Sequence, residues 1–200
     1  MPEVAPMLIV CAEAVRVEAE LVGGVMSCPS CRGRLRPWGR ARERVLRCAA
    51  GDRSLRPRRA RCRGCAATHV LLPDLALLRR RDEVAVIGVA IEAKVAGVGH
   101  RRIAERLGVP KDTVRGWLRR FVARAEQARA HFMRWAFALD PELGPVMPAG
   151  GVLADALEAI AVAVRAWVLR FGPAGAWQLI CALSGGVLLC NTSCPFPPVR

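Results

Sequence analysis

Aromatic residues are scarce in this 200-residue chain: tyrosine is absent, and phenylalanine and tryptophan occur five times each. Proteins that recognise unpaired RNA bases stack them on aromatic side chains, commonly on strands. The scarcity therefore argues against an RNA-binding function, an alternative for which Trp38 remains available.

Acidic residues and histidines are also few, at 17 and three. A nuclease or transposase core needs two metal ions held by acidic residues from separated parts of a sizeable fold. Beyond residue 139 the only carboxylates lie in a proline-rich stretch and on an amphipathic segment: Asp140, Glu142, Asp155 and Glu158. The usual glycine-rich phosphate loops are absent as well. We therefore expect no catalytic residues and a protein that is not an enzyme.

No hydrophobic run reaches the length of a membrane span, and the chain opens on Met-Pro-Glu without the basic leader of a secretory signal. The most apolar segment, 152–171, contains four charged residues, so we expect a buried helix there. Nine cysteines in such a chain favour reduced thiols or a metal site over disulfides. These features predict a cytoplasmic, nucleoid-associated protein with no membrane partner.

Positive charge is abundant, with 31 Lys and Arg residues and a net charge of +14. It is concentrated in two blocks. Residues 28–81 hold sixteen Arg against three acidic residues, and residues 100–134 hold nine Arg and Lys111 against three. Basic charge that is gathered in this way is typical of a protein that binds a polyanion, so nucleic acid is the expected partner.

Changes in sequence pattern divide the chain into four parts. Residues 1–27 fit either a helix or a strand, whereas 28–81 contain short segments broken by Cys, Gly, Pro and Arg and predict a small zinc ribbon. Helical periodicity over 82–139 predicts a helix-turn-helix domain with an extended last helix. Residues 140–200 begin with a linker rich in proline and glycine and predict a helical extension that ends in a loose tail. The expected fold class is mainly α, with a small β zinc ribbon on the N-terminal side, a helix-turn-helix core and C-terminal helices.

Within the expected ribbon, two Cys-x-x-Cys pairs stand out, CPSC at 28–31 and CRGC at 62–65. Two intervening residues let both thiolates face one ion, and four thiolates complete the tetrahedral shell that zinc accepts. A segment with so few large apolar residues needs such a staple, which makes two unrelated buried thiol pairs the weaker alternative. We predict a zinc site formed by Cys28, Cys31, Cys62 and Cys65. The pattern leaves open whether Cys48, His69, Cys190 or Cys194 also binds metal.

Short strands are expected in the same region around 34–38, 44–47, 54–56 and 68–72, with a turn at 49–52. Further along, the segment GHRRIAERLGVPKDTVRGWLRRF, residues 99–121, contains two helical patterns that meet at Gly108. Gly108 can adopt the left-handed conformation of a sharp turn, Ala104 is small enough for a close helix crossing, and Pro110 suits a helix start. This combination predicts a helix-turn-helix whose second helix enters the major groove of DNA.

With its apolar residues facing inward, the second helix presents a polar side to a partner. Arg115 is the best candidate for a base contact, because a guanidinium can bond guanine O6 and N7 together. Lys111 and Thr113 can read bases or hold phosphate, and Asp112 either reads a cytosine amino group or caps its own helix. Phosphate contacts, which give register and affinity, are expected from Arg101, Arg102, Arg119 and Arg120. A merely solvated helix face is the alternative interpretation.

The order of five motifs resembles that of an uncharacterised bacterial family of helix-turn-helix, transposase-like proteins of insertion elements: CPSC, LRPWG, RPRRARCRGCAATHVLLP, GHRRIAERLGVPKDTVRGWLRRF and NTSCPFPP. The resemblance runs from about Cys28 to Pro198. The zinc-ribbon-plus-helix-turn-helix front end is similar to the N-terminal DNA-binding part of several insertion-sequence transposases. This resemblance implies DNA binding, with the four cysteines of the two pairs at the metal positions, and it implies no catalytic residues.

Taken together, these patterns predict a non-catalytic protein that binds double-stranded DNA through a helix-turn-helix and an Arg-rich zinc ribbon, in transposition or in transcription regulation. The alternative is a protein–protein interaction module that docks a transposase or polymerase. In that case the helices expected over 117–139 and 152–171 would pair with a transposase subunit or with a second copy in a homodimer, although they can equally pack on each other.

Overall fold

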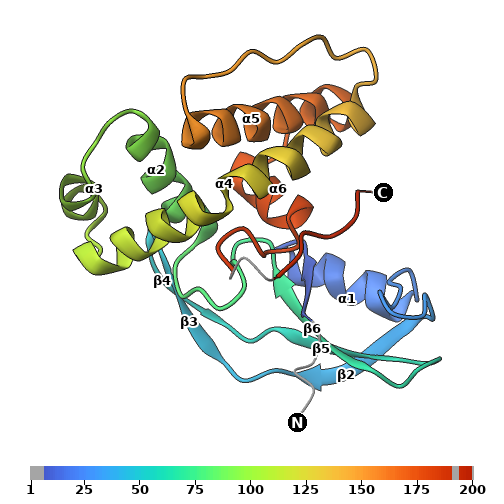
Figure 1. The fold of residues 1–200 in the computed structure, drawn as a ribbon. Helices are drawn as coiled ribbons and strands as arrows, with labels where there is room; N and C mark the ends of the chain where they lie inside the picture. The colour runs from blue at the N-terminus through green and yellow to red at the C-terminus, as the bar shows by residue number, and fades with distance from the viewer. Residues whose placement is uncertain (1–6, 191–193, 200) are drawn as a thin grey trace.

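The structure, a computed structural model, describes residues 7–190 and 194–199. Helices occupy 45% and strands 19% of the chain, and Figure 1 shows a curved sheet region with one helix below a group of five helices. The prediction of a mainly α protein with only a small β ribbon is wrong, because the N-terminal half forms six strands in a mixed sheet arrangement.

Four strands make the main sheet, in the order β1-β6-β5-β2, and the other two form a separate hairpin. β1 pairs with β6 in parallel, and the remaining pairs are antiparallel. The strands are β1 (Met7–Val10), β2 (Leu35–Arg40), β3 (Arg44–Cys48), β4 (Gly51–Leu55), β5 (Arg58–Cys62) and β6 (Thr68–Pro73). The sequence patterns predicted β2, β3, β4 and β6 but not the central strand β5.

Two segments enlarge the sheet beyond the predicted ribbon. β5 has the sequence RRARC, which lacks the β-branched and aromatic residues that mark strands; its buried positions are only Ala60 and Cys62. β1 comes from the N-terminal segment 1–27, of which residues 1–6 lie outside the described chain. Tertiary pairing, rather than local propensity, therefore determines β5. The apolar run of β1 (MLIV) favours a strand locally, and its pairing with β6 makes it part of the sheet.

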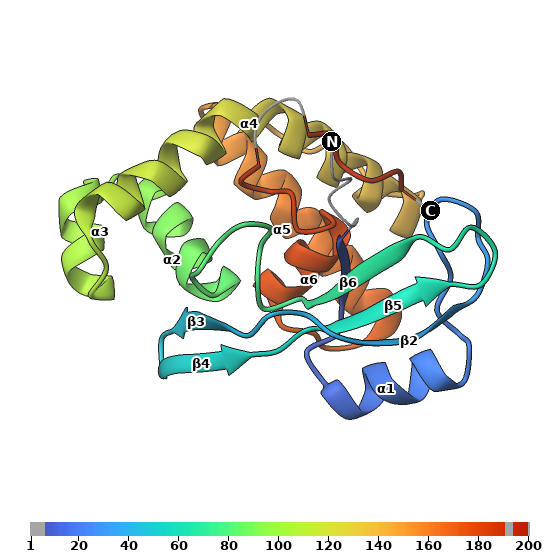
Figure 2. The same ribbon diagram turned by 90° about the horizontal axis from the view of Figure 1, so that it is seen from below.

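The N-terminal segment 1–27, for which the sequence allowed a helix or a strand, contains both: β1 is followed by α1 (Ala14–Val22). α1 covers one face of the main sheet, as Figure 2 shows, and its Val17 and Leu21 pack against Leu35 and Leu71 of the strands. Glu18 of the same helix binds the guanidinium of Arg58 through two hydrogen bonds of 2.6 Å. The sheet region is thus held by a small apolar cluster and an ion pair.

The other helices are α2 (Val84–Val95), α3 (His100–Leu107), α4 (Lys111–Leu139), α5 (Val152–Phe171) and α6 (Ala176–Leu183). They share one large apolar core, in which Phe121 and Phe132 of α4 are fully buried. α4 and α5 pack along each other: the Arg170 guanidinium donates to the Leu139 carbonyl at their C-terminal ends (3.2 Å), and the rings of Trp135 and Trp167 meet edge to face. The 29-residue helix α4 confirms the long apolar periodicity seen in the sequence.

The hairpin β3–β4 joins the two layers. The Arg47 backbone accepts from the N–H of Glu83 and donates to the carbonyl of Arg81, at 2.9 and 2.7 Å. The Arg47 guanidinium also lies 2.8 Å from the carboxylate of Asp82, whose side chain is only 4% exposed. Because Asp82 immediately precedes the start of α2, these contacts fix the hairpin beside the helical layer.

Residues 194–199, the described part of the predicted tail, form no helix or strand but contact α4. Arg124 of α4 donates from Nη1 to the Cys194 carbonyl at 2.9 Å, and its guanidinium lies 4.5 Å from the ring centre of Phe196. The buried His131 ring also stacks on Phe196, with ring centres 4.6 Å apart. Ser193 and Arg200 of the predicted tail lie outside the described residues.

Within residues 7–190 and 194–199, no helix combines the length and apolar character that crossing a bilayer requires.

Candidate metal centre and basic surface

The two Cys-x-x-Cys segments form matching turns at the same end of the sheet. The Cys28 N–H donates to the Gly33 carbonyl (2.8 Å), and the Cys62 N–H donates to the Ala67 carbonyl (2.9 Å). The residue after the second cysteine of each pair is left-handed, with φ of 60° at Arg32 and 59° at Ala66. Because Leu35 and Cys62 are paired in register on β2 and β5, the sheet brings both turns together.

All four sulfur atoms of Cys28, Cys31, Cys62 and Cys65 lie within 4.8 Å of one another. The closest pairs are Cys31 with Cys62 at 3.3 Å and Cys28 with Cys65 at 3.7 Å. A tetrahedral shell with metal–sulfur bonds of about 2.3 Å places its sulfurs about 3.8 Å apart. The four predicted cysteines therefore form a cluster that can hold a metal ion.

Space around the cluster is kept open by Gly33. A Cβ at this position would lie 3.0 Å from the Cys62 sulfur and 3.3 Å from the Cys31 sulfur, so a larger residue would press against two of the candidate ligands. The Gly64 N–H donates to the Cys62 sulfur at 3.3 Å. Backbone amides that point at the sulfurs stabilise thiolate charge, which a metal site requires.

The pKa values of Cys28, Cys62 and Cys65 are shifted in different directions. The Cys65 N–H is the main cause that lowers the pKa of Cys62, to about 6, against the opposing effect of burial. Burial alone would raise the pKa of Cys28, but N–H donors of Cys31 and Ser30 and the ring of His69 outweigh it and lower the pKa to about 7. The Ala67 N–H favours the Cys65 thiolate, yet proton sharing with Cys31 and burial raise that pKa to about 12. The surroundings thus favour the thiolate at Cys28 and Cys62 and the protonated thiol at Cys65.

His69 belongs to this centre as a partner of a ligand. Its fully buried imidazole has Nε2 3.4 Å from the Cys28 sulfur, where an Nε2–H can donate to the thiolate. Such outer contacts orient metal ligands and tune their charge. The sequence left the role of His69 open. The feature that could have predicted its burial is its position two residues before Leu71 on β6, because side chains two apart on a strand lie on the same face, here the inward one.

The other cysteines in question do not join the cluster. Cys48 lies with its sulfur 3.6 Å from the Leu46 carbonyl, and burial raises its pKa. Burial also raises the pKa of Cys190. Across the described residues, the grouping of three or more candidate metal ligands consists of the four cysteines of the two turns.

A second candidate site lies where α3 meets α4. Gly108 between them has φ of 62°, the left-handed conformation expected of the turn, and α4 begins directly after Pro110. Ile103, Ala104 and Val114 are buried at the junction. The two helices and the left-handed turn expected between them are therefore present.

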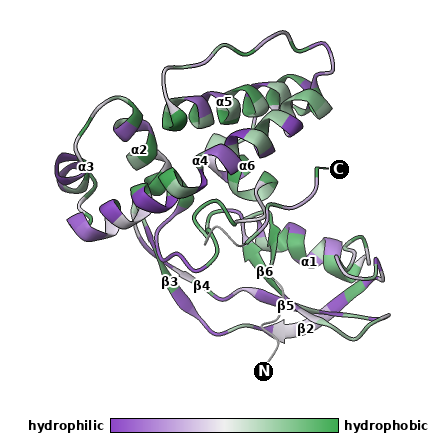
Figure 3. Ribbon diagram, in the orientation of Figure 1, coloured by the Kyte–Doolittle hydropathy of each residue, from purple (hydrophilic) through white to green (hydrophobic). Residues whose placement is uncertain are grey.

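The predicted contact residues lie on the open side of this junction, with two exceptions. Lys111, Asp112, Arg115 and Arg119 of α4 are exposed, as are Arg101 and Arg102 of α3. Thr113 and Arg120 are half-buried, and Arg120 donates from Nη1 to the Gly116 carbonyl at 3.0 Å. Figure 3 shows hydrophilic residues on α3 and on the first turns of α4.

Sequence reasoning missed a basic segment that borders this surface. Arg79 and Arg81 are exposed just before α2, and residues 79–82 line a hollow of about 220 Å³ together with Thr113, Gly116 and Arg120. A second hollow, of about 300 Å³, is lined both by the tip of the β3–β4 hairpin at 48–52 and by the α3–α4 turn at 106–109. The basic block 28–81 thus lies next to the basic block 100–134 in space. In the sequence, the only sign of the bordering segment is the arginine run at 79–81.

Residues 28–126 match the family described as a domain of unknown function, DUF6431. The matched segment contains the four clustered cysteines, the strands from β2 to β6 and the first turns of α4. No curated protein matches the chain, and no solved structure does.

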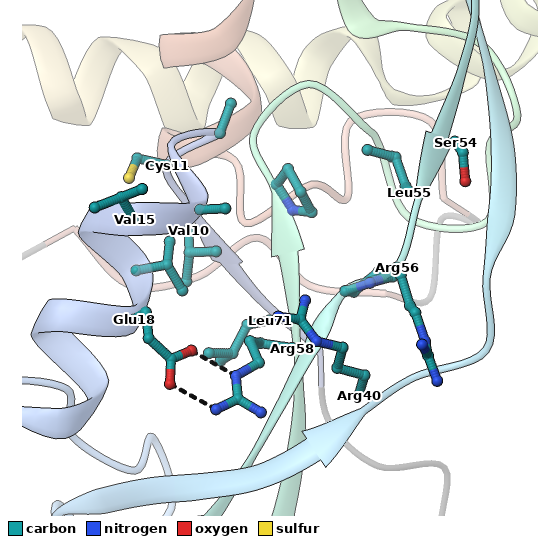
Figure 4. A pocket seen from close by; sticks show the side chains of 15 residues that line it. Val10, Cys11, Val15, Glu18, Arg40, Ser54, Leu55, Arg56, Arg58 and Leu71 are labelled. Carbon is teal, nitrogen blue, oxygen red and sulfur yellow. Dashed lines mark hydrogen bonds and ion pairs between the residues drawn. The ribbon is translucent and has the colours of Figure 1, made fainter.

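A hollow of about 550 Å³ lies between α1 and the strands (Figure 4). Its lining includes the apolar residues Val10, Val17 and Leu71 and the paired Glu18 and Arg58. Arg40 and Arg56 also line it, so guanidinium groups outnumber carboxylates here too.

Proposed function

We propose that this protein binds double-stranded DNA without catalysing a reaction on it, and that the first turns of α4 lie in the major groove. The observation that supports this most is the division of those turns into two sides. Val114, Trp117 and Leu118 are buried against the helical core, while the opposite side exposes the charged residues Lys111, Arg115 and Arg119. A short helix preceding a sharp turn, followed by a helix with an open basic side, is the arrangement that a helix-turn-helix uses.

In this proposal the residues have separate roles. Arg115 contacts a guanine edge, because its side chain is exposed on the second turn of α4 and a guanidinium is bidentate. Arg101, Arg102 and Arg119 bind phosphates and set the register. Arg79 and Arg81, which border the same surface, extend the phosphate contacts toward the hairpin. Asp112 lies in the first turn of α4, where a carboxylate interacts favourably with the positive end of the helix dipole.

We further propose that the metal held by the four cysteines is zinc, since four thiolates at these distances form the shell of a structural zinc site. Its role is to fix the turns at the ends of β2 and β5 and, through the sheet, the Arg-rich strands. The resemblance of the motif order supports a nucleoid-associated role in transposition or transcription regulation.

The test is the binding of a mixed-sequence DNA duplex, measured by fluorescence anisotropy at several salt concentrations. If six or more phosphates are neutralised, affinity should fall on the order of a thousandfold between roughly 50 and 200 mM salt. Lys111→Ala together with Arg115→Ala should weaken binding, whereas the matched control Arg165→Ala, an exposed arginine on α5, should not. A duplex affinity that changes neither with salt concentration nor in the α4 variants would overturn the proposal.

A protein-interaction module remains the second candidate, and one observation favours it. Although α4 and α5 pack on each other, Phe137, Leu169 and Phe171 near their C-terminal ends are 50%, 80% and 59% exposed. Clustered exposed apolar residues often mark contacts with a partner. A molecular mass that rises with protein concentration in the absence of DNA, and that stays constant in the Leu169→Ser variant, would support self-association through these ends.

A further inference from the structure

Trp38 lies on β2, an edge strand of the main sheet, away from the surface of α4. Its side chain is 41% exposed, and it takes no part in the three apolar clusters of the described residues. The pairing of β2 with β5 shifts register between Pro37 and Arg40. A bulge of this kind re-aims a side chain, so the indole is displayed on the surface rather than packed in a core.

Two guanidinium groups flank the indole. The Arg61 guanidinium lies 4.6 Å and that of Arg36 lies 5.3 Å from the ring centre. Arg36 and Arg61 are register partners on β2 and β5, and Arg61 also donates from Nε to the Ala66 carbonyl at 3.3 Å. The indole therefore lies between two cations whose backbones are paired, and one of these cations is also hydrogen-bonded to the chain.

Beside this group lies an open hollow of about 350 Å³. It is lined by Arg36, Arg61, Cys62, Arg63 and Ala66, so three of its lining residues are arginines and none is acidic. An anion is the complementary occupant. Because the flat aromatic surface and the anion site adjoin, the chemistry that fits both is a planar ring joined to a phosphate.

We propose that Trp38, Arg36 and Arg61 form a binding site for an unpaired base of single-stranded DNA, with the adjacent phosphates held by Arg63 and its neighbours. Every base has a π-face that stacks on an indole or a guanidinium, and basic grooves follow the phosphate backbone. Bases within a duplex have both faces covered by their neighbours, so this site selects unpaired strands. It is separate from the α4 surface and does not depend on the duplex-binding proposal.

The test compares a labelled oligothymidine of roughly twelve nucleotides, a length within the range of one single-strand site, with a duplex of mixed sequence. Trp38→Ala should weaken oligothymidine binding about tenfold, and Trp38→Phe, which keeps a ring, should recover most of it. Val22→Ala, the truncation of an exposed apolar residue of α1 that is 69% exposed, serves as the matched control and should change neither affinity. Duplex binding should stay within about twofold of wild type in all three variants.

Two results would overturn the single-strand site: oligothymidine affinity that Trp38→Ala leaves unchanged, or an equal loss for oligothymidine and duplex. Metal content and thermal unfolding of each variant establish that the sheet is intact. A Trp38 effect that persists while variants of Lys111 and Arg115 leave duplex binding unchanged would refute the duplex proposal alone. The opposite pattern would refute the single-strand site alone.

Discussion

The sheet half and the helical half of the molecule bury very different amounts of apolar surface. Over the described chain, the helical half has one cluster of 28 buried hydrophobic residues, whereas the sheet half has two clusters of seven and four. Two of the seven in the larger sheet cluster are Cys28 and Cys62 of the candidate metal centre. The helices are thus stabilised by packing in one large core. The sheet has smaller apolar clusters, one of which includes two of the clustered cysteines, together with contacts such as the Glu18–Arg58 pair.

The two basic surfaces therefore rest on differently stabilised parts of the molecule. The charged side of α4 is supported from behind by Trp117 and Phe121 of the large core. The guanidinium groups around Trp38 are supported by strands that the cysteine turns hold together. Removing a metal from the cysteine cluster should therefore disturb the surface around Trp38 more than the charged side of α4. This difference is the largest effect that we expect.

Chelation of the metal, or Cys62→Ser, should unfold the sheet half and leave the helical half folded. Metal binding to such a site contributes on the order of 10 kcal/mol of folding free energy, more than the two small apolar clusters can replace. Hydrogen exchange measured by mass spectrometry should show lost protection in β2, β5 and β6 and retained protection in α4 and α5. Cys48→Ser, outside the cluster, is the matched control. Equal protection of both halves after chelation would show that the comparison is mistaken.

Acid should have the same effect more gradually. The pKa of Cys28 is lowered to about 7 and that of Cys62 to about 6, so both sulfurs are thiolates above these values. As the pH falls through this range, protons compete with the metal and its apparent affinity should decrease. Competition with a chromophoric chelator from about pH 8 to about pH 5 measures this. An affinity that stays constant over that range would contradict the assignment of the thiolates as ligands.

Phe121→Ala should destabilise the helical half by about 3–5 kcal/mol, because it removes a fully buried ring from the large core. Phe137→Ala, at a position 50% exposed, should cost less than about 0.5 kcal/mol. Urea unfolding of the metal-loaded protein, followed by circular dichroism, gives both values. If Phe121→Ala also removes exchange protection from β5 and β6, the two halves unfold as one unit through the hairpin contacts of Arg47.

Arg115→Ala and Arg119→Ala should weaken duplex binding in different ways. Arg115 is assigned to a base edge, so its loss should cost about 1–3 kcal/mol at one base position and relax the preference there. Arg119 is assigned to phosphate, so its loss should weaken all sequences alike and reduce the salt slope by about one. Selection from random duplexes provides the profiles. Identical profiles for the two variants would refute this division of roles.

The smallest effect is expected for Glu18→Gln. The Arg58 hydrogen bonds lower the pKa of Glu18, so the pair contributes stability above the unfolded pKa of the carboxyl group and loses it as the pH falls. Because the Glu18 side chain is 41% exposed, solvent screens the pair and the change should cost less than about 1 kcal/mol. Thermal unfolding at neutral and acidic pH measures it. A cost of several kcal/mol would mean that α1 depends on this contact more than on Val17 and Leu21.

Local patterns were sufficient for much of the helical half. The periodicity from Trp117 to Leu139, the turn at Gly108 and the linker after Leu139 all depend on neighbours three or four residues apart, which a sequence displays directly. The same holds for the two cysteine pairs, because each turn is closed by bonds within six residues. These features were correctly predicted.

The extent of the sheet was decided by tertiary structure alone. β5 has no local signature because its stability comes from pairing with β2 and β6, and β1 becomes part of the sheet only by lying parallel to a strand about sixty residues away. The contact of Arg79 and Arg81 with the α4 surface, and that of Phe196 with Arg124, likewise join residues that are distant in the chain. The sequence determined which short segments form helices and cysteine turns, whereas pairing across long separations, whose entropy cost only the complete fold repays, decided how they assemble.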